Sequence, residues 1–182
     1  MKELSLNILD IAQNSIKARA TLVSIIIDET DETLKFSIID DGCGMKKDFL
    51  THVTDPFTTS RTTRSVGLGL PFLKMEAEMT GGTFAIESRH ESEYADHGTT
   101  VTASFDKRSI DYIPLGDIIG TVCTLIQGTD DGIDYRFVHN MPDKTVELDT
   151  RQMRGILGDE VSLNDPEVMA WIRDYLQEGY NA

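Results

Sequence analysis

The sequence has little cysteine and proline and no long apolar run, which argues against a disulfide-rich, zinc-binding or membrane-spanning protein. Among its 182 residues are only two cysteines and five prolines. Cys43 and Cys123 lie far apart, with no Cys-x-x-Cys or histidine cluster beside them, so neither a disulfide framework nor a zinc site is expected. No apolar run approaches the roughly 18 residues of a membrane span, and Met1 leads into polar residues without a signal-peptide core. We therefore expect a cytoplasmic protein with two reduced, buried thiols and no membrane partner.

Basic residues are also scarce. There are 17 Lys and Arg against 31 Asp and Glu, a formal net charge of −14, and such a chain repels nucleic-acid phosphates. General nucleic-acid binding is therefore not expected. The acidity is strongest after residue 108, because residues 109–182 hold 14 acidic and 5 basic side chains. We predict a boundary near Ser109, between an N-terminal domain (1–108) and an acidic C-terminal extension (109–182) of undefined role.

The spacing of apolar residues predicts alternating helices and strands. The predicted helices cover residues 2–20, 46–53, 68–79, 115–127 and 165–178. The predicted strands cover residues 21–28, 34–40, 83–88 and 99–105, with a further hairpin in 134–148. Residues 54–66 have turn composition and no apolar period, which predicts a loop.

The first predicted helix carries a polar stripe beside its apolar face. Asp10 and Asn14 are four residues apart, so their side chains project from adjacent turns on one side. An amide oxygen can ligate Mg²⁺, and a neighbouring carboxylate can orient or deprotonate a water molecule. When such a pair stands alone, a solvated helix face is the commoner explanation.

A turn with two glycines follows the second predicted strand. Residues 40–45 (DDGCGM) allow unusual backbone angles and a close approach to a flat ligand, and Asp40 could accept a hydrogen bond from an exocyclic amine. The alternative is a tight turn with a capping aspartate.

A third segment, residues 66–70 (VGLGL), opens a helix. Glycines there leave backbone N–H groups free to face phosphate oxygens at the positive end of the helix dipole. Residues 56–75 contain no acidic side chain, while Arg61, Arg64 and Lys74 are present. An anion is expected at this position, although a glycine-rich connection with surface arginines is the plainer alternative. Gly98 and Thr99, which begin a later strand, indicate little by themselves.

In this order the segments resemble the N-box, G1, G2 and G3 motifs of the GHKL superfamily of ATP-binding domains, which includes gyrase, MutL, histidine kinases and the ninety-kilodalton chaperone. The resemblance covers most of residues 8–106. It implies an α/β sandwich of the Bergerat type, in which helices cover one face of a mixed, mostly antiparallel sheet. Residues 109–182 would form a small α+β extension.

The resemblance also implies ATP and Mg²⁺ as cofactors and a set of site residues. Asp10 would be the catalytic carboxylate, Asn14 the Mg²⁺ ligand and Asp40 the acceptor for the adenine amino group, with Thr99 supporting that end. Residues 54–66 would form a lid over ATP. The implied nucleotide contacts are Asn14, Asp40, Gly42, Gly44, Met45, Thr59, Arg61, Gly67, Leu68, Gly69, Leu70 and Thr99.

Departures from the family leave three functions open. Asp10 stands where the ATPase members have a glutamate, and a shift of about 1 Å can cost a hundredfold in rate. No histidine precedes His52, so autophosphorylation by the usual arrangement is not expected. The remaining functions are a regulatory kinase acting on a separate protein, a slow ATPase that switches a partner, and an ATP sensor or interaction module without turnover. A homodimer is left open.

Overall fold

The computed structural model describes residues 3–55, 68–129, 132–158 and 161–182. The strands are β1 (Leu22–Glu29), β2 (Thr33–Asp40), β3 (Phe84–Arg89), β4 (Gly98–Asp106), β5 (Asp134–Asn140) and β6 (Thr145–Asp149). The helices are α1 (Leu4–Lys17), α2 (Lys47–Leu50), α3 (Gly69–Met79), α4 (Ile118–Gln127), α5 (Thr150–Leu157) and α6 (Pro166–Asn181). In these ranges, no helix is both long and apolar enough to cross a membrane.

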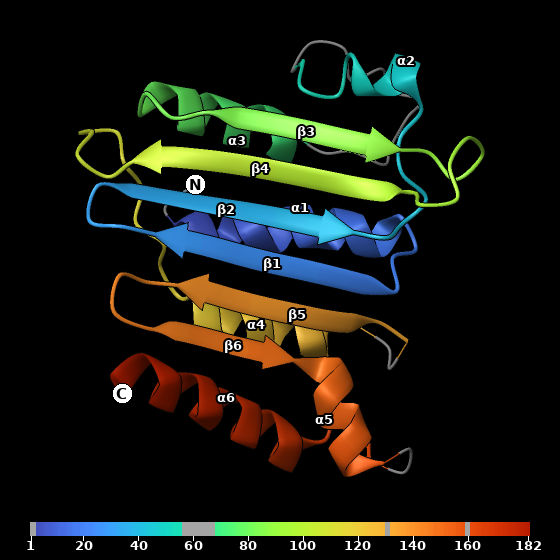
Figure 1. The fold of residues 1–182 in the computed structure, drawn as a ribbon, viewed down its shortest axis with the longest axis vertical. Coiled ribbons are helices and arrows are strands. Elements are labelled where there is room, and N and C mark those ends of the chain that lie inside the picture. The colour runs from blue at the N-terminus through green and yellow to red at the C-terminus, as the bar shows by residue number, and fades with distance from the viewer. Residues whose placement is uncertain (1–2, 56–67, 130–131, 159–160) are drawn as a thin grey trace.

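All six strands form one sheet, in the order β3-β4-β2-β1-β5-β6 (Figure 1). The β-branched runs of β1 and β2 pair as the predicted hairpin at its centre. Every neighbouring pair is antiparallel except β1 and β5, which run parallel from Leu22 opposite Asp134 to Asp28 opposite Asn140. The predicted mixed, mostly antiparallel sheet is confirmed. It continues without interruption across the connection between β4 and α4, in which Ser109 lies.

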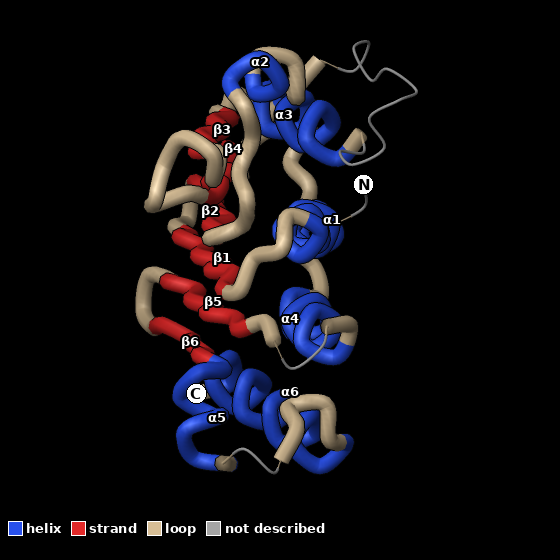
Figure 2. The backbone as a smooth tube through the Cα atoms, turned by 90° about the vertical axis from the view of Figure 1, so that its right-hand side faces the viewer, coloured by secondary structure: helices blue, strands red, loops and turns tan. Residues whose placement is uncertain are grey.

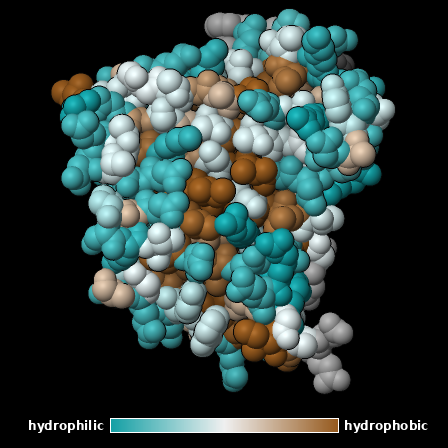
Figure 3. Space-filling view, viewed as in Figure 1, coloured by the Kyte–Doolittle hydropathy of each residue, from teal (hydrophilic) through white to brown (hydrophobic). Residues whose placement is uncertain are grey.

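The helices α1, α3 and α4 lie side by side on one face of the sheet, and α6 lies beside the β6 edge (Figure 2). Alternating residues of the strands fill the core between these two layers, because successive side chains of a strand point to opposite faces. Val23, Ile25 and Ile27 of β1 are at most 1% exposed, and Phe36 stacks on Phe105 with ring centroids 5.9 Å apart. The opposite face of the sheet has no helix over it among the described residues, and Figure 3 views the molecule from that side.

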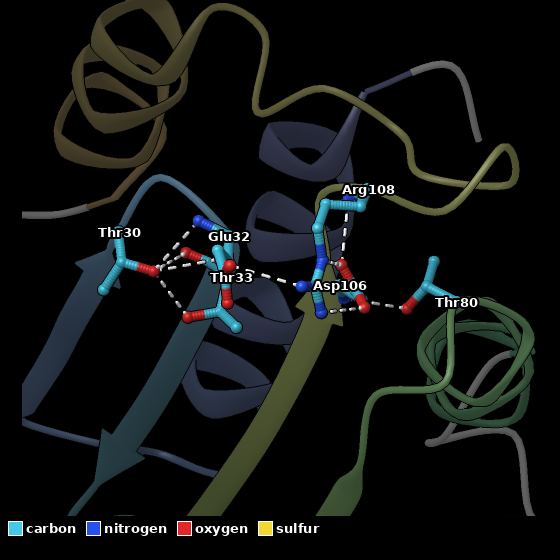
Figure 4. Close-up of polar contacts among 6 residues, drawn as sticks. All are labelled: Thr30, Glu32, Thr33, Thr80, Asp106 and Arg108. Atoms are coloured by element: carbon cyan, nitrogen blue, oxygen red, sulfur yellow. Dashed lines mark hydrogen bonds and ion pairs between the residues drawn. The ribbon is translucent and has the colours of Figure 1, made fainter.

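Polar contacts tie the turn between β1 and β2 to the end of β4 (Figure 4). The Thr30 hydroxyl accepts a hydrogen bond from Thr33 N at 2.9 Å, which closes the turn. The Arg108 guanidinium donates to the Asp106 carboxylate at 2.9 and 3.0 Å and lies 3.2 Å from that of Glu32. Exposed pairs of this kind add little stability. They mark the end of the sheet opposite to Asp40, since β2 runs away from this turn.

The element boundaries differ little from those predicted, with one helix missed. The segment before α6 was not predicted to be helical, yet Thr150–Leu157 forms α5, which Asp149 caps by accepting a hydrogen bond from Arg151 N at 3.0 Å. The last helix continues to Asn181, three residues beyond its predicted end. Both differences lie after residue 149, so they do not affect the elements that carry the N-terminal motifs.

Candidate functional site

A cavity of about 320 Å³ lies at the Asp40 end of the sheet. Its walls come from α1, the ends of β2 and β4, the glycine turn after β2, α2 and the start of α3. The lining residues are Ile11, Asn14, Ser15, Lys17, Ala18, Ile38, Asp40, Cys43, Gly44, Met45, Lys46, Phe49, Leu70, His90, Thr99 and Val101. Segments far apart in the sequence therefore meet around one space.

Six of the predicted nucleotide contacts line this cavity, namely Asn14, Asp40, Gly44, Met45, Leu70 and Thr99. Four predicted residues are not among those that line the cavity, namely Asp10, Gly42, Leu68 and Gly69. Three further predictions, Thr59, Arg61 and Gly67, lie outside the described residues.

Hydrogen bonds hold the Asp40 carboxylate from three directions. Its Oδ2 accepts from the Ser15 hydroxyl at 2.6 Å, and its Oδ1 accepts from Gly42 N at 2.9 Å and Thr99 N at 3.2 Å. Burial raises the pKa of Asp40 above its usual value of 3.8, and these hydrogen bonds oppose the rise. A carboxylate has about four lone-pair sites, so Asp40 keeps acceptor capacity toward the cavity.

The neighbouring Asp41 has a different role. Its carboxylate accepts hydrogen bonds from the backbone N–H of Thr21 at 2.7 Å and of Leu22 at 2.9 Å, and from the Thr21 hydroxyl at 2.5 Å. Burial acts to raise the pKa of Asp41, but these bonds lower it overall. Asp41 therefore fastens the glycine turn to the start of β1 and does not line the cavity.

The glycine turn packs too tightly for side chains at two positions. Gly44 has φ +66°, and a Cβ there would lie 1.9 Å from the carbonyl oxygen of Arg89. A Cβ on Gly42 would lie 2.9 Å from Cβ of Ala18. The carbonyl oxygen of Gly42 also accepts a hydrogen bond from Nδ1 of His97 at 2.6 Å. The turn is thus fixed against α1 and against both ends of the loop that joins β3 to β4.

Asp10 reaches the start of α3 instead of the cavity wall. A Cβ on Gly69 would lie 1.8 Å from Oδ2 of Asp10, so the Asp10 carboxylate occupies the space that a side chain at position 69 would need. Gly69 is the first residue of α3, where unpaired N–H groups and the helix dipole favour negative charge. The N-box carboxylate and the G2 glycine are therefore neighbours in space.

Sequence reasoning missed several lining residues. Ser15 lies on the apolar face of the first helix and is only 3% exposed, but its hydroxyl donates a hydrogen bond to Asp40. Lys17 and Lys46 place two cations in the cavity wall of a strongly acidic chain. Lys17 lies three residues after Asn14, so the helical period places both on the polar stripe of the first helix, but Lys17 was not among the predicted contacts. His90 had no motif context, since it comes from the loop after β3.

Comparison with known proteins finds a sequence family that matches the N-terminal part of the chain. The sequence family described as Histidine kinase-, DNA gyrase B-, and HSP90-like ATPase matches residues 2–109. The sensor histidine kinase YvrG of Bacillus subtilis (strain 168) is 27% identical over 101 residues, which cover 52% of this chain and 17% of YvrG. The chain therefore spans only about a sixth of the length of that relative.

Two solved structures align with the chain. The N-terminal domain of a DNA repair protein superposes with a TM-score of 0.58 at 16% identity, covering 87% of this chain and 58% of that one. This likeness concerns the fold, and it covers more of the chain than residues 2–109, which the family model matches. The catalytic domain of the histidine kinase ThkA gives a TM-score of 0.39 at 21% identity, covering 54% of this chain and 60% of that one.

Proposed function

Because the chain belongs to the histidine kinase-, DNA gyrase B- and HSP90-like ATPase family, we propose that it binds Mg-ATP in the cavity beside Asp40 and passes the γ-phosphate to a separate protein or to water. The observation that carries this proposal is the Asp40 carboxylate. It is fixed by Ser15, Gly42 and Thr99, and it keeps acceptor capacity toward a cavity with apolar walls. An adenine ring needs both features, because its faces are apolar and its exocyclic amine donates hydrogen bonds.

The donors near α1 fit the phosphate end of Mg-ATP. Mg²⁺ prefers six oxygen ligands and is usually held by one or two protein groups together with phosphates and water. Asn14 offers one amide oxygen in the cavity wall, and the described residues contain no cluster of three or more His, Cys, Asp or Glu that could hold a metal ion without phosphate. Bound Mg²⁺ would neutralise charge on the phosphates. Lys17 and Lys46 would add cationic contacts to them from the protein.

Asp10 is the proposed proton acceptor. It stands one helical turn from Asn14 and against Gly69, next to the end of α3 that favours an anion. During transfer an oxygen of water or of a protein side chain bonds to the γ-phosphorus, the bond to the ADP oxygen breaks, and Asp10 takes the nucleophile's proton. Asp10 can also act by orienting that nucleophile.

The test follows both free phosphate and phosphoprotein. Purified protein would be incubated with Mg²⁺ and γ-labelled ATP, with and without native cell extract. We expect Asp10→Asn to lower turnover by at least about a hundredfold while ATP affinity changes little, since a general base contributes about 10²–10⁴ in rate. Unchanged turnover in Asp10→Asn would refute its role as base.

The label distinguishes the candidate activities. Label on one extract protein, lost in Asn14→Ala, would identify a kinase and its substrate. Free phosphate without labelled protein would identify an ATPase. Tight ATP binding without either signal would instead favour an ATP sensor, and absence of ATP binding would overturn the proposal itself.

A further inference from the structure

Two aromatic rings are exposed on the outer surface of α6. Trp171 is 54% exposed and Tyr175 is 42% exposed, and their rings stack with centroids 5.2 Å apart and planes 15° apart. Ile156 of α5, which is 86% exposed, lines the same cavities as Trp171. Single exposed apolar residues are normal on protein surfaces, whereas several gathered around a hollow mark a binding surface.

Two cavities, of about 330 and 420 Å³, adjoin beside these rings because they share Met153, Ile156 and Trp171. The larger one is lined by Met153, Ile156, Leu157, Glu167, Val168 and Trp171. The smaller one continues from Trp171 to Tyr175 and to strands β5 and β6. We call the two cavities together the α5–α6 groove. It lies at the β6 edge of the sheet, the edge farthest from β3 (Figure 1).

A row of carboxylates borders the aromatic rings on α6. Glu167, Asp174 and Glu178 are exposed, and at about 100° per residue they lie within about 60° of Trp171 around the helix axis. All three lie on the side of Trp171 that faces away from Val168 and the groove floor. Within the ranges that the structure describes, none of these carboxylates forms an ion pair. The row is therefore available to a cation from outside the chain.

The arginines of α5 and β5 do not neutralise this row. Arg151 pairs with Asp149 at 2.6 Å, and Arg154 pairs with Asp134 at 3.0 Å. Arg136 lies opposite Asp149 in the register of β5 and β6. These basic side chains are thus matched by carboxylates on the sheet side of the groove.

Arg173, the one basic residue of α6, lies on another side of that helix. The helical period places it about 160° from Trp171. Burial raises the pKa of Cys123 on α4, and the charge of Arg173 opposes the rise, so Arg173 is directed toward α4. The side of α6 that borders the groove therefore carries carboxylates without a basic residue among them.

An apolar groove with an acidic border fits a basic amphipathic helix. From Glu167 to Glu178 the row extends about 16 Å along α6, which matches three turns of a partner helix. Apolar side chains on one face of that helix would enter the two cavities. Lysine or arginine side chains beside them would reach the carboxylates and the face of Trp171.

Two other occupants fit this surface less well. A partner strand cannot pair with β6, because α6 lies along that edge, where a Cβ on Gly179 would be 3.2 Å from Cγ1 of Val146. A second copy of the chain would bring the same carboxylate row against its own equivalent, and like charges placed together oppose binding.

We propose that the α5–α6 groove binds a lysine- or arginine-bearing amphipathic helix of a different protein. The groove shares no lining residue with the cavity beside Asp40, so a partner can be held there while that cavity stays accessible. This inference does not depend on the proposed function.

The groove contains its own reporter, because Trp171 is the one tryptophan of the chain. The probe is a synthetic peptide of about 14 residues, with leucines at helical spacing and lysines between them. Added to the full chain at low salt, it should shift Trp171 emission to shorter wavelength with a Kd of about 1 to 100 µM. Its affinity should fall as salt is added. The same peptide with glutamate in place of lysine, or with proline at its centre, should bind at least about tenfold more weakly.

Two variants and two matched controls test the surface itself. Asp174→Lys and Ile156→Ser should each weaken binding of the lysine peptide by about tenfold. Asp111→Lys and Ile110→Ser make the same changes at exposed residues outside the groove, and both should keep full affinity. All four residues are exposed, so the melting temperature should change little in each variant.

Three results would overturn the proposal. They are an unchanged Trp171 emission at up to about 1 mM lysine peptide, equal binding of the glutamate or proline peptide, and full affinity in Asp174→Lys and Ile156→Ser. An emission shift that follows protein concentration without any peptide would also overturn it, because a second copy of the chain would then cover the groove.

Discussion

At the scale of single residues, two adjacent aspartates at the end of β2 have different roles. Asp40 lines the cavity, whereas the carboxylate of Asp41 accepts hydrogen bonds from the backbone of Thr21 and Leu22. We predict that Asp40→Asn weakens ATP binding by about 10- to 100-fold, because an amide offers less acceptor capacity to the adenine amino group. Titration calorimetry with ATP and GTP would measure the loss and the base preference.

Asp41→Asn is the matched control for this prediction. It removes the same charge one residue away, and it should lower the melting temperature while the preference for ATP over GTP is kept. Equal affinity of the unchanged protein for ATP and GTP would contradict the assignment of Asp40, as would an Asp40→Asn variant with full ATP affinity.

The residues around Asp40 show which parts of the site could be predicted from the sequence and which could not. Asp40 could be predicted because it follows a β-branched strand and precedes two glycines. Its partner Ser15 could not, because a small polar residue on an apolar helix face gives no sign of a hydrogen bond to a residue 25 positions away. Asp10 was identified as a carboxylate near Asn14, but its contact with Gly69 depends on how α1 and α3 pack. Spacing alone does not reveal such packing.

At the scale of elements, α6 is fastened to the sheet by a buried histidine. His139 on β5 is 2% exposed, with Nδ1 2.7 Å from the hydroxyl of Tyr180 on α6 and Nε2 3.0 Å from the carboxylate of Glu29. In the neutral ring that satisfies both contacts, Nε2 donates to Glu29 and Nδ1 accepts from Tyr180. Burial lowers the pKa of His139 below 6.5, against the opposing charges of Glu29 and Asp28 and with the help of Lys107.

This shift predicts a loss of stability in mild acid. Since the folded pKa is the lower one, the unfolded chain binds more protons between the two values, and the free energy of unfolding falls as pH decreases from about 6.5 through the folded pKa. Urea unfolding between about pH 5 and about pH 8 would measure the slope. In His139→Gln the slope above about pH 5 should flatten, whereas His90→Gln, in the loop after β3, should keep it. An unchanged slope in His139→Gln would refute the assignment.

The elements themselves followed from local pattern, but their partners did not. The hairpin of β1 and β2 was predictable because a short polar turn joins two β-branched runs. The parallel pairing of β1 with β5 was not, because it joins residues more than a hundred positions apart and depends on the packing of α4 beneath them. The short helix α5 was missed for a related reason. It is eight residues long and mostly polar, it buries only Thr150 and Met153, and it forms against β5.

At the scale of the whole molecule, the continuous sheet bears on the predicted division at residue 108. The family match ends at residue 109, close to that division, yet β1 pairs with β5 and α1 packs on α4 across it. Leu4 and Ile8 of α1 are fully buried in a core that also contains Val122 and Phe137. A chain ending at residue 108 would expose the free edge of β1 and part of that core to water.

We therefore predict that a fragment of residues 1–108 is less stable than the full chain by several kcal/mol, at about 25 cal/mol for each Å² of apolar surface uncovered. Urea unfolding followed by circular dichroism would measure the difference, and amide exchange should locate the lost protection in β1 and α1. A fragment of residues 1–158 keeps β5 and β6 but lacks α6, and it should show an intermediate loss. If the fragment of residues 1–108 unfolds at the same urea concentration as the full chain, then the N-terminal domain folds independently and residues 109–182 do not stabilise it.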